Sequence, residues 1–343
     1  MRWLTALAPN LLTPGAYRRA VRALAQRRGW RVREYDERAL AREGCGAFLA
    51  VVQGSAARDA AIVRVSYRPK RAARGARPIA LVGKGLCFDT GGVNLKPQKS
   101  MQGMHADMSG SAVALGILDA LSALDLPHPV DAWLALAENH VGPSACKPND
   151  VVRAANGTTI EIVHTDAEGR MVLADTLALA ARTGPACLID FATLTGACVG
   201  ALTERYSGVF TNRPALRDVL EQAGAASGER VWGFPTPPDF DEELESRAAD
   251  VLQCLPDGKG DHLYATRFLN RFVPATIPWA HVDLSSVHRP GGLAHVNGPF
   301  TGFGVRFGTT LLLDCLRRFE AAAGPPPTSY PAPARRAARR SAR

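Results

Sequence analysis

The chain has 343 residues, a formal net charge of +9 and 46% hydrophobic residues. This length allows one large α/β domain with an appendage or two ordinary domains, and it can bury a sizeable core. The longest apolar run, residues 111–124, contains Asp119 and is shorter than the roughly 18 residues that span a bilayer, so no membrane segment is expected.

Two features indicate the compartment. The first ten residues lack the apolar length and the cleavage site of a secretory signal. The seven cysteines are odd in number and show no CxxC spacing, which argues against both a disulfide framework and a zinc–thiolate site. We therefore expect a cytoplasmic protein.

The positive charge is concentrated at the carboxyl end. Five arginines lie in residues 335–343, after the proline-rich segment 324–334. Because such a composition cannot bury a core, we expect residues 324–343 to form a disordered tail. The tail could contact nucleic acid or acidic surfaces nonspecifically, but a solvated, solubilising role is favoured.

The first predicted elements are a helix and short strand-like pieces. Thr13 is placed as N-cap with Pro14 at the first helical position, and the helix continues to Gly29. A strand-like piece at 30–35, a basic helical stretch and apolar segments follow. The charged link at 70–77 is a candidate boundary between residues 1–77 and 78–323.

Beyond this link, strand-like and helical segments alternate. This alternation predicts an α/β fold, a three-layer αβα domain with a central, mostly parallel or mixed sheet. The strands are expected at 78–83, 130–138, 187–194 and 279–285, and the helices at 110–124, 171–182, 214–224, 262–273 and 304–321. In such sheets ligands bind where the strands end.

A hairpin is predicted at residues 151–165, with Asn156-Gly157 as its turn. In its second arm Ile160 and Ile162 face one side. If that alternation continues, the side chains of 164, 166, 168 and 170 follow them toward the core. The alternative is that the strand ends at Thr165 and the charges that follow are solvated loop residues. Spacing alone favours the alternative.

A second group of charged residues occupies residues 82–108. Lys84 leaves an apolar strand, Asp89 precedes two glycines, Lys96 precedes a proline and Asp107 opens the next predicted helix. Each has an ordinary explanation as a surface lysine, a turn residue or a helix cap. Together with the charges at 166–170, however, four carboxylates and three cations would converge at strand ends.

These stretches resemble the signatures of one enzyme family. "VGKGLCFDTGGVNLKP", "DM" and "HTDAEGR" are similar to motifs of the leucyl aminopeptidase (cytosol aminopeptidase) family, and the similarity covers about residues 78–321. The resemblance implies a two-metal hydrolase. It implies metal ligation by Lys84, Asp89, Asp107, Asp166 and Glu168, with Asp89 and Glu168 bridging, and catalytic roles for Lys96 and Arg170.

The charge balance makes this arrangement reasonable. Four carboxylates neutralise two divalent ions, which removes the repulsion that otherwise disfavours the cluster. Lys84 can ligate only as a neutral amine, and two nearby dications would lower its pKa. The donor set suits zinc or manganese, and magnesium or cobalt as well.

The resemblance further implies an aminopeptidase that acts on peptides with a free N-terminus. A water bridging the metals would attack, Lys96 would stabilise the oxyanion, and Arg170 would hold a bicarbonate as general base. The first side-chain pocket, with a leucine-like preference, would be bordered by Met104, Thr193, Leu194 and Gly196.

Several residues depart from the family pattern. His105 replaces a usual lysine and His164 a usual asparagine, and His262 and His295 lie in divergent segments. Packing, surface or capping roles are favoured over ligation for all four, and their roles stay open. Residues 10–30 resemble the helix that follows a full N-terminal domain in the family, so most of that domain is expected to be missing. The resemblance implies a homo-hexamer.

Two other functions are alternatives to the aminopeptidase. One is a noncatalytic or DNA-associated scaffold, suggested by the basic tail and the missing domain. It is disfavoured because a scaffold has no need of Lys96 and Arg170, so nucleic acid is not an expected partner. The other, a two-metal hydrolase such as a phosphatase, is disfavoured by a lysine ligand.

Overall fold

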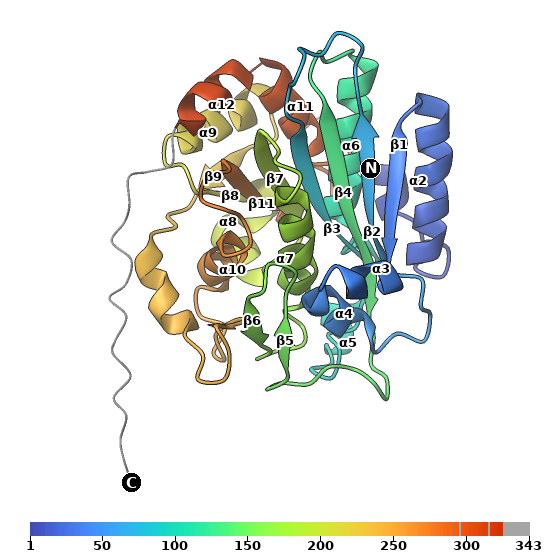
Figure 1. Ribbon diagram of the computed structural model, residues 1–343, viewed down its shortest axis with the longest axis vertical. Helices are drawn as coiled ribbons and strands as arrows, with labels where there is room; N and C mark the ends of the chain where they lie inside the picture. Colours follow the sequence, from blue (N-terminus) through green and yellow to red (C-terminus); the bar gives the residue numbers. More distant parts are fainter. Residues whose placement is uncertain (295, 315, 325–343) are drawn as a thin grey trace.

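A central eight-stranded sheet organises the computed structural model, which describes residues 1–294, 296–314 and 316–324 (Figure 1). The strand order is β1-β2-β4-β3-β7-β11-β8-β9. The strands are β1 (Arg31–Asp36), β2 (Ala61–Tyr67), β3 (Ile79–Asp89), β4 (Val130–Asn139), β7 (Cys187–Ala192), β8 (Ser207–Thr211), β9 (Val231–Gly233) and β11 (Trp279–Asp283).

The middle of this sheet is parallel and antiparallel pairs flank it on both sides, while the edge strand β9 pairs in parallel with β8. β4, β3, β7 and β11 pair in parallel, whereas β1 with β2, β2 with β4, and β11 with β8 pair antiparallel. The parallel strands are buried on both faces, so their sequences are nearly continuous apolar runs rather than alternating ones. The predicted mixed α/β sheet is confirmed.

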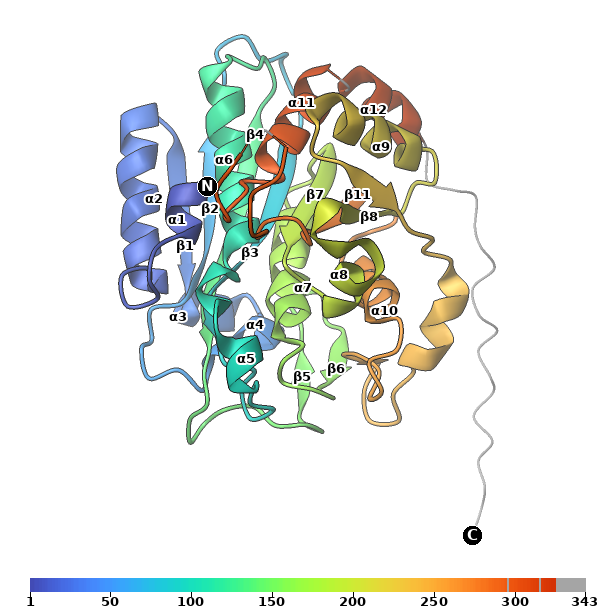
Figure 2. The same cartoon turned by 180° about the vertical axis from the view of Figure 1, so that it is seen from behind.

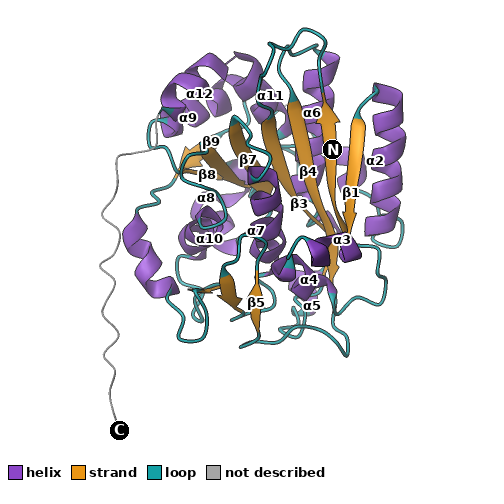
Figure 3. Ribbon diagram, viewed as in Figure 1, coloured by secondary structure: helices purple, strands orange, loops and turns teal. Residues whose placement is uncertain are grey.

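Helices cover both faces of the sheet, so the domain has three layers (Figures 2 and 3). Along β3, Ile79 and Leu81 enter one apolar core, while Ala80 and Val82 enter the other. The first core is completed by α1 (Arg2–Thr5), α2 (Pro14–Arg28), α6 (Ser109–Ala123), α9 (Leu216–Ser227), α11 (Val305–Asp314) and α12 (Leu316–Ala323). The second is completed by α3 (Glu37–Arg42), α4 (Gly46–Val52), α7 (Glu168–Ala181) and α10 (Asp261–Asn270).

Short elements fill the loops at the carboxyl ends of the strands and beside them. These are α5 (Gln98–Met101), α8 (Gly196–Leu202) and the 3₁₀ helices η1 (Met104–Ala106), η2 (Thr203–Arg205) and η3 (Pro238–Leu244). The single helix expected over 304–321 is observed as α11 and α12, on either side of position 315, which lies outside the described residues. None of the helices in the described ranges combines the length and apolar character needed to cross a membrane.

The predicted N-terminal helix is confirmed. The Thr13 hydroxyl accepts a hydrogen bond from the Ala16 amide at 3.3 Å, and the helix ends at Gly29, whose φ of 70° is left-handed. From there the chain enters β1, and β2 joins the sheet through β4. Residues on both sides of position 77 therefore share one sheet. The division into 1–77, 78–323 and 324–343 stays a prediction, and residues 325–343 lie outside the described part.

The predicted hairpin is also present, as part of a small sheet. β5 (Val151–Arg153) and β6 (Thr159–Glu161) pair antiparallel around Asn156-Gly157, and β10 (Val251–Leu252) adds to β6. Ile160 and Ile162 are buried as expected.

Strand alternation up to residue 170, the less favoured of the two sequence interpretations, does not occur. β6 ends at Glu161, and the chain turns before α7 begins at Glu168. The alternative of solvated loop charges is also wrong for two of them, because Glu168 and Arg170 lie on a buried helix and are each 2% exposed.

Candidate functional site

The parallel strands β3, β7 and β11 end at a cavity of about 620 Å³. This is the edge of an α/β sheet where ligands bind. The structure brings all the sequence-predicted site residues to its walls: Lys84, Asp89, Lys96, Met104, Asp107, Asp166, Glu168, Arg170, Thr193, Leu194 and Gly196.

Asp89 is placed by the end of β3 and the glycine turn after it. Its Oδ1 accepts hydrogen bonds from Asn139 Nδ2 at 2.8 Å and from the Gly91 amide at 2.9 Å. Gly91 has a φ of 88°, and a Cβ there would lie 2.5 Å from the Asn94 carbonyl oxygen. Glycine is the residue that suits this position.

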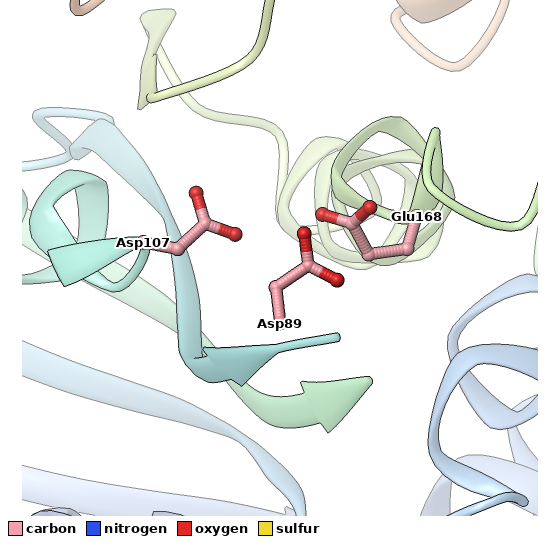
Figure 4. Close-up of side chains that lie close together, drawn as sticks. All are labelled: Asp89, Asp107 and Glu168. Atoms are coloured by element: carbon pink, nitrogen blue, oxygen red, sulfur yellow. The ribbon is translucent and has the colours of Figure 1, made fainter. Parts of the chain in front are cut away.

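Three buried carboxylates form the acidic cluster, which we define as Asp89, Asp107 and Glu168 (Figure 4). Each offers an oxygen within 4.8 Å of those of the other two. Asp107 lies between η1 and α6, whereas Glu168 is the first residue of α7. Segments far apart in sequence thus converge because their strands and helices end at the same edge.

Two lysines lie among these carboxylates. Lys84 Nζ is 2.8 Å from Asp107 Oδ2 and 2.8 Å from Glu168 Oε1. Lys96 Nζ is 2.9 Å from Asp89 Oδ2 and also forms an ion pair with Asp166. Burial alone would lower the pKa of each lysine, but the surrounding carboxylates raise it above the ordinary value.

Gly169 is a site residue that the sequence reasoning missed. A Cβ at this position would lie 2.7 Å from Lys84 Cε and 2.8 Å from its Nζ. Glycine at the second position of α7 is therefore needed for Lys84 to pass between β3 and the helix. The glycine of "AEGR" was visible in the sequence, but its packing partner was not.

The two lysines do not neutralise all the negative charge around the acidic cluster, and they do not provide every buried oxygen with a hydrogen-bond partner. Burial raises the pKa of Glu168 to about 8 and that of Asp107 to about 6, and repulsion from Asp89 adds to both shifts. Glu168 Oε2 is buried and has no hydrogen-bond partner among the described residues. Four carboxylates face two ammonium groups, which leaves negative charge uncompensated. These residues fit a site for divalent cations, for which buried carboxylates are suitable ligands.

Arg170 is buried, and both Nη atoms of its guanidinium donate to other groups of the chain, whereas its Nε has no hydrogen-bond partner among the described residues. Its Nη2 donates to Asp261 Oδ1 at 2.8 Å and Oδ2 at 2.7 Å, and its Nη1 donates to the Gln253 carbonyl at 3.2 Å. This arrangement does not fit the bicarbonate expected at Arg170, because a carboxylate of the protein takes the place of the anion.

Sequence reasoning missed Asp261. It follows Gly258 and Gly260 and opens α10, so it resembled an ordinary acidic residue in the first turn of a helix. Its partner lies 91 residues earlier in the chain. No local pattern reveals such a pairing.

Three of the four residues expected to border the side-chain pocket, Thr193, Leu194 and Gly196, follow the end of β7. Thr193 Oγ1 donates to Asp107 Oδ1 at 2.6 Å, and the Leu194 amide donates to Asp283 Oδ1 at 3.1 Å. Nothing lies within 4 Å of a Cβ built on Gly196. Thr193 therefore also orients a member of the acidic cluster, which the sequence did not predict.

The divergent histidines lie in different environments. His164 lines the cavity, and its Nδ1 accepts from the Asp166 amide at 3.3 Å. His105 packs edge-on against Phe300, and His262 against Phe234. Burial lowers the pKa of His105 and His262. His295 lies outside the described residues.

Comparison with known proteins agrees with this geometry. The model of the cytosol aminopeptidase family, catalytic domain, matches residues 1–309. Curated relatives named "Probable cytosol aminopeptidase" include one from Desulfovibrio desulfuricans, 42% identical over 287 residues, which cover 83% of this chain and 57% of the relative. Another, from Clavibacter michiganensis, is 44% identical over 286 residues, 80% of this chain and 56% of the relative.

A third relative of the same name, from Rhodopseudomonas palustris, is 40% identical over 309 residues, which are 89% of this chain. The chain spans 56% to 60% of the length of these three relatives. The family match extends over both the sheet and the residues around the cavity. The chain belongs to the cytosol aminopeptidase family.

Proposed function

We propose that this protein is a metal-dependent aminopeptidase that hydrolyses the N-terminal peptide bond of peptides. The observation that carries the proposal is the acidic cluster, three buried carboxylates with oxygens within 4.8 Å of one another at the wall of a cavity. Membership of the cytosol aminopeptidase family supports the same reaction.

Two divalent ions would be held by the cluster and its neighbours. Asp89 and Glu168 would bridge the ions, Asp166 would complete one site, and Lys84 and Asp107 the other. To ligate, Lys84 must lose one proton of the ammonium group that now forms ion pairs with Asp107 and Glu168. Zinc or manganese suits this donor set, and magnesium or cobalt is also compatible. Bound ions would supply Lewis acidity and a water of lowered pKa.

The charged residues of the cavity have different roles in binding the substrate and in stabilising the oxyanion. The free α-amine of a peptide would be held at the part of the cavity where Lys84 and Asp107 lie, which would restrict cleavage to the first peptide bond. Lys96, whose side chain is 13% exposed, remains a cation and donates to the oxyanion that forms at the attacked carbonyl. Its ion pairs with Asp89 and Asp166 hold the ammonium group at the cavity wall before substrate binds.

The specificity of the site depends on its rim. Met104, Thr193, Leu194 and Gly196 line one part of the cavity. Methionine and leucine provide apolar contacts, and the open space above Gly196 leaves room for a branched side chain. We therefore propose a preference for leucine-like N-terminal residues.

Assembly and location belong to the same proposal. The resemblance to the family favours a homo-hexamer, and the relatives are named cytosol aminopeptidases, which agrees with a cytoplasmic location. The scaffold alternative was suggested by the basic tail and the missing domain. Residues 325–343 of that tail lie outside the described part of the chain.

The test begins with chelator-treated protein. We expect hydrolysis of leucine amide after addition of manganese or zinc, and none with chelator present. N-acetyl-leucine amide, which lacks the free amine, serves as the matched substrate control and should stay intact. If leucine amide survives with all four divalent ions at several pH values, the proposed function is wrong.

A further inference from the structure

Arg170 and Asp261 form an ion pair in which the arginine is buried and the carboxylate is partly exposed. The Arg170 side chain is 2% exposed, whereas that of Asp261 is 25% exposed, and both residues line the cavity. The guanidinium contacts both carboxylate oxygens at 2.7–2.8 Å. The buried arginine thus holds a carboxylate that remains accessible from the cavity.

Local backbone structure fixes this carboxylate. Asp261 is the first residue of α10, directly after Gly260, whose φ of 62° turns the chain into the helix. Arg170 is held in turn by α7 and by its bond to the Gln253 carbonyl. Both partners therefore belong to rigid elements, and the position of the carboxylate is set by the fold.

We propose that Asp261 supplies the general base of the reaction, in place of any external anion at Arg170. This proposal rests on the aminopeptidase function proposed above. As water attacks the carbonyl carbon, its oxygen forms the new C–O bond, its proton passes to the Asp261 carboxylate, and the carbonyl electron pair moves to oxygen. When the C–N bond breaks, that proton passes to the leaving amine, and the carboxylate is restored.

A second arginine–carboxylate pair offers a matched comparison. On the same helix, Arg267 donates from Nε and Nη2 to the two oxygens of Asp241, at 2.8 and 2.7 Å. Asp241, at 29% side-chain exposure, is about as accessible as Asp261, but it lies on η3, outside the cavity wall. A purely structural role predicts similar consequences for loss of either carboxylate, whereas a role as base predicts a kinetic effect for Asp261 alone.

The kinetic test uses three variants of the full-length, metal-loaded protein. Asp261→Asn should lower kcat for leucine amide by about 100- to 10,000-fold with little change in KM. Asp261→Ala should lose similar activity, and because it leaves space beside Arg170, added bicarbonate or formate should restore much of kcat. Asp241→Asn should keep the kcat of the unaltered protein and gain nothing from either anion.

Two further measurements do not depend on turnover. By calorimetry, bicarbonate should bind Asp261→Ala and show no comparable binding to the unaltered protein. In thermal unfolding, bicarbonate should raise the Tm of Asp261→Ala and leave that of Asp261→Asn unchanged, because the amide still fills the space.

Three outcomes would overturn the proposal: an unaltered protein that requires added bicarbonate, an Asp261→Asn variant with normal kcat, or an Asp261→Ala variant whose kcat no small anion restores. If the unaltered protein hydrolyses no aminoacyl amide, the aminopeptidase function fails and the base role with it. Calorimetry then still decides whether Asp261 occupies the anion position at Arg170, so the two failures are distinguishable.

Discussion

Helix α7 carries two buried carboxylates whose surroundings differ. Asp175 is fully buried; its Oδ2 accepts from the Phe48 amide at 2.8 Å and its Oδ1 from the Ala155 amide at 2.7 Å. Glu168, two turns earlier, faces two other carboxylates, and its Oε2 has no partner among the described residues. Asp175 joins α7 to α4 and to the hairpin, whereas Glu168 opens onto the cavity.

Burial alone does not distinguish the structural carboxylate Asp175 from the proposed ligand Glu168. It raises the pKa of Asp175 to about 7 and that of Glu168 to about 8. The difference is that neutral amides satisfy both oxygens of Asp175, whereas Lys84 contacts only Oε1 of Glu168, its Oε2 has no partner among the described residues, and two other carboxylates lie close by at the cavity wall. A buried carboxylate therefore indicates a ligand site when its partners are missing, and a structural role when they are present.

The largest effect is expected for Glu168→Gln. The amide cannot bridge two cations, so metal-dependent hydrolysis should fall below detection and metal should no longer raise the Tm. Burial and repulsion from Asp89 raise the pKa of Glu168 above that of the unfolded chain, so its carboxylate opposes folding as pH rises from about 4.5 to about 8. The metal-free variant should therefore be at least as stable as the unaltered protein at pH 8. A normal metal-induced rise in Tm would contradict the ligand assignment.

The next effect concerns Lys96, which contacts the cluster but is not proposed as a ligand. Lys96→Met removes the cation expected at the oxyanion, so kcat should fall by about 100- to 1,000-fold while metal affinity is retained. Steady-state kinetics and metal titration on the same preparation measure the two quantities. If metal affinity and kcat fall together by the same factor, Lys96 acts only by supporting metal binding.

Asp175 should behave in the opposite way to Glu168. Asp175→Asn places an amide NH2 group next to a backbone N–H, so at about pH 4 and below it should destabilise the fold by about 1–3 kcal/mol. Metal affinity and kcat should be unchanged. The pKa of Asp175 is raised to about 7 in the folded protein, so its contribution to the free energy of unfolding is greatest below about pH 4. Up to roughly 4 kcal/mol of that free energy is lost as pH rises to about 7. Urea unfolding across this range should show a flatter pH dependence in the variant. A variant with reduced metal affinity would break the comparison.

The smallest effect is expected at the rim. Met104→Ala removes apolar contact from the proposed side-chain pocket, so the ratio of kcat/KM for leucine amide over alanine amide should fall by roughly 10-fold. Met101→Ala, in α5 and outside the cavity wall, is the matched control and should leave the ratio unchanged. An equal change in both variants would remove Met104 from the pocket.

Much of the fold follows from local patterns. The strands from 78, 130, 187 and 279 were recognisable because parallel strands buried on both faces are short apolar runs between helices. Thr13-Pro14 and Asn156-Gly157 marked a helix start and a hairpin through local backbone chemistry. The convergence of residues 84–107 with 166–170 followed from the rule that parallel strands end at one edge and from the family resemblance.

What the sequence did not reveal depends on contacts between distant segments. Both sequence interpretations let the strand run to about Thr165, although β6 ends at Glu161 and the chain turns there to start α7. The need for glycine at 169 appears only when Lys84 of β3 lies against it. Asp261 resembled a helix-start residue until its arginine partner was located. Each depends on tertiary packing, which periodicity and turn chemistry do not encode.

The central claim is that the acidic cluster holds divalent cations, and X-ray anomalous scattering tests it most directly. Crystals soaked in manganese should show two anomalous peaks, bounded by Asp89, Asp107, Asp166, Glu168 and Lys84. Soaked crystals of Glu168→Gln should lose both peaks. An unaltered protein with no peak at this position under saturating manganese and zinc would contradict the account.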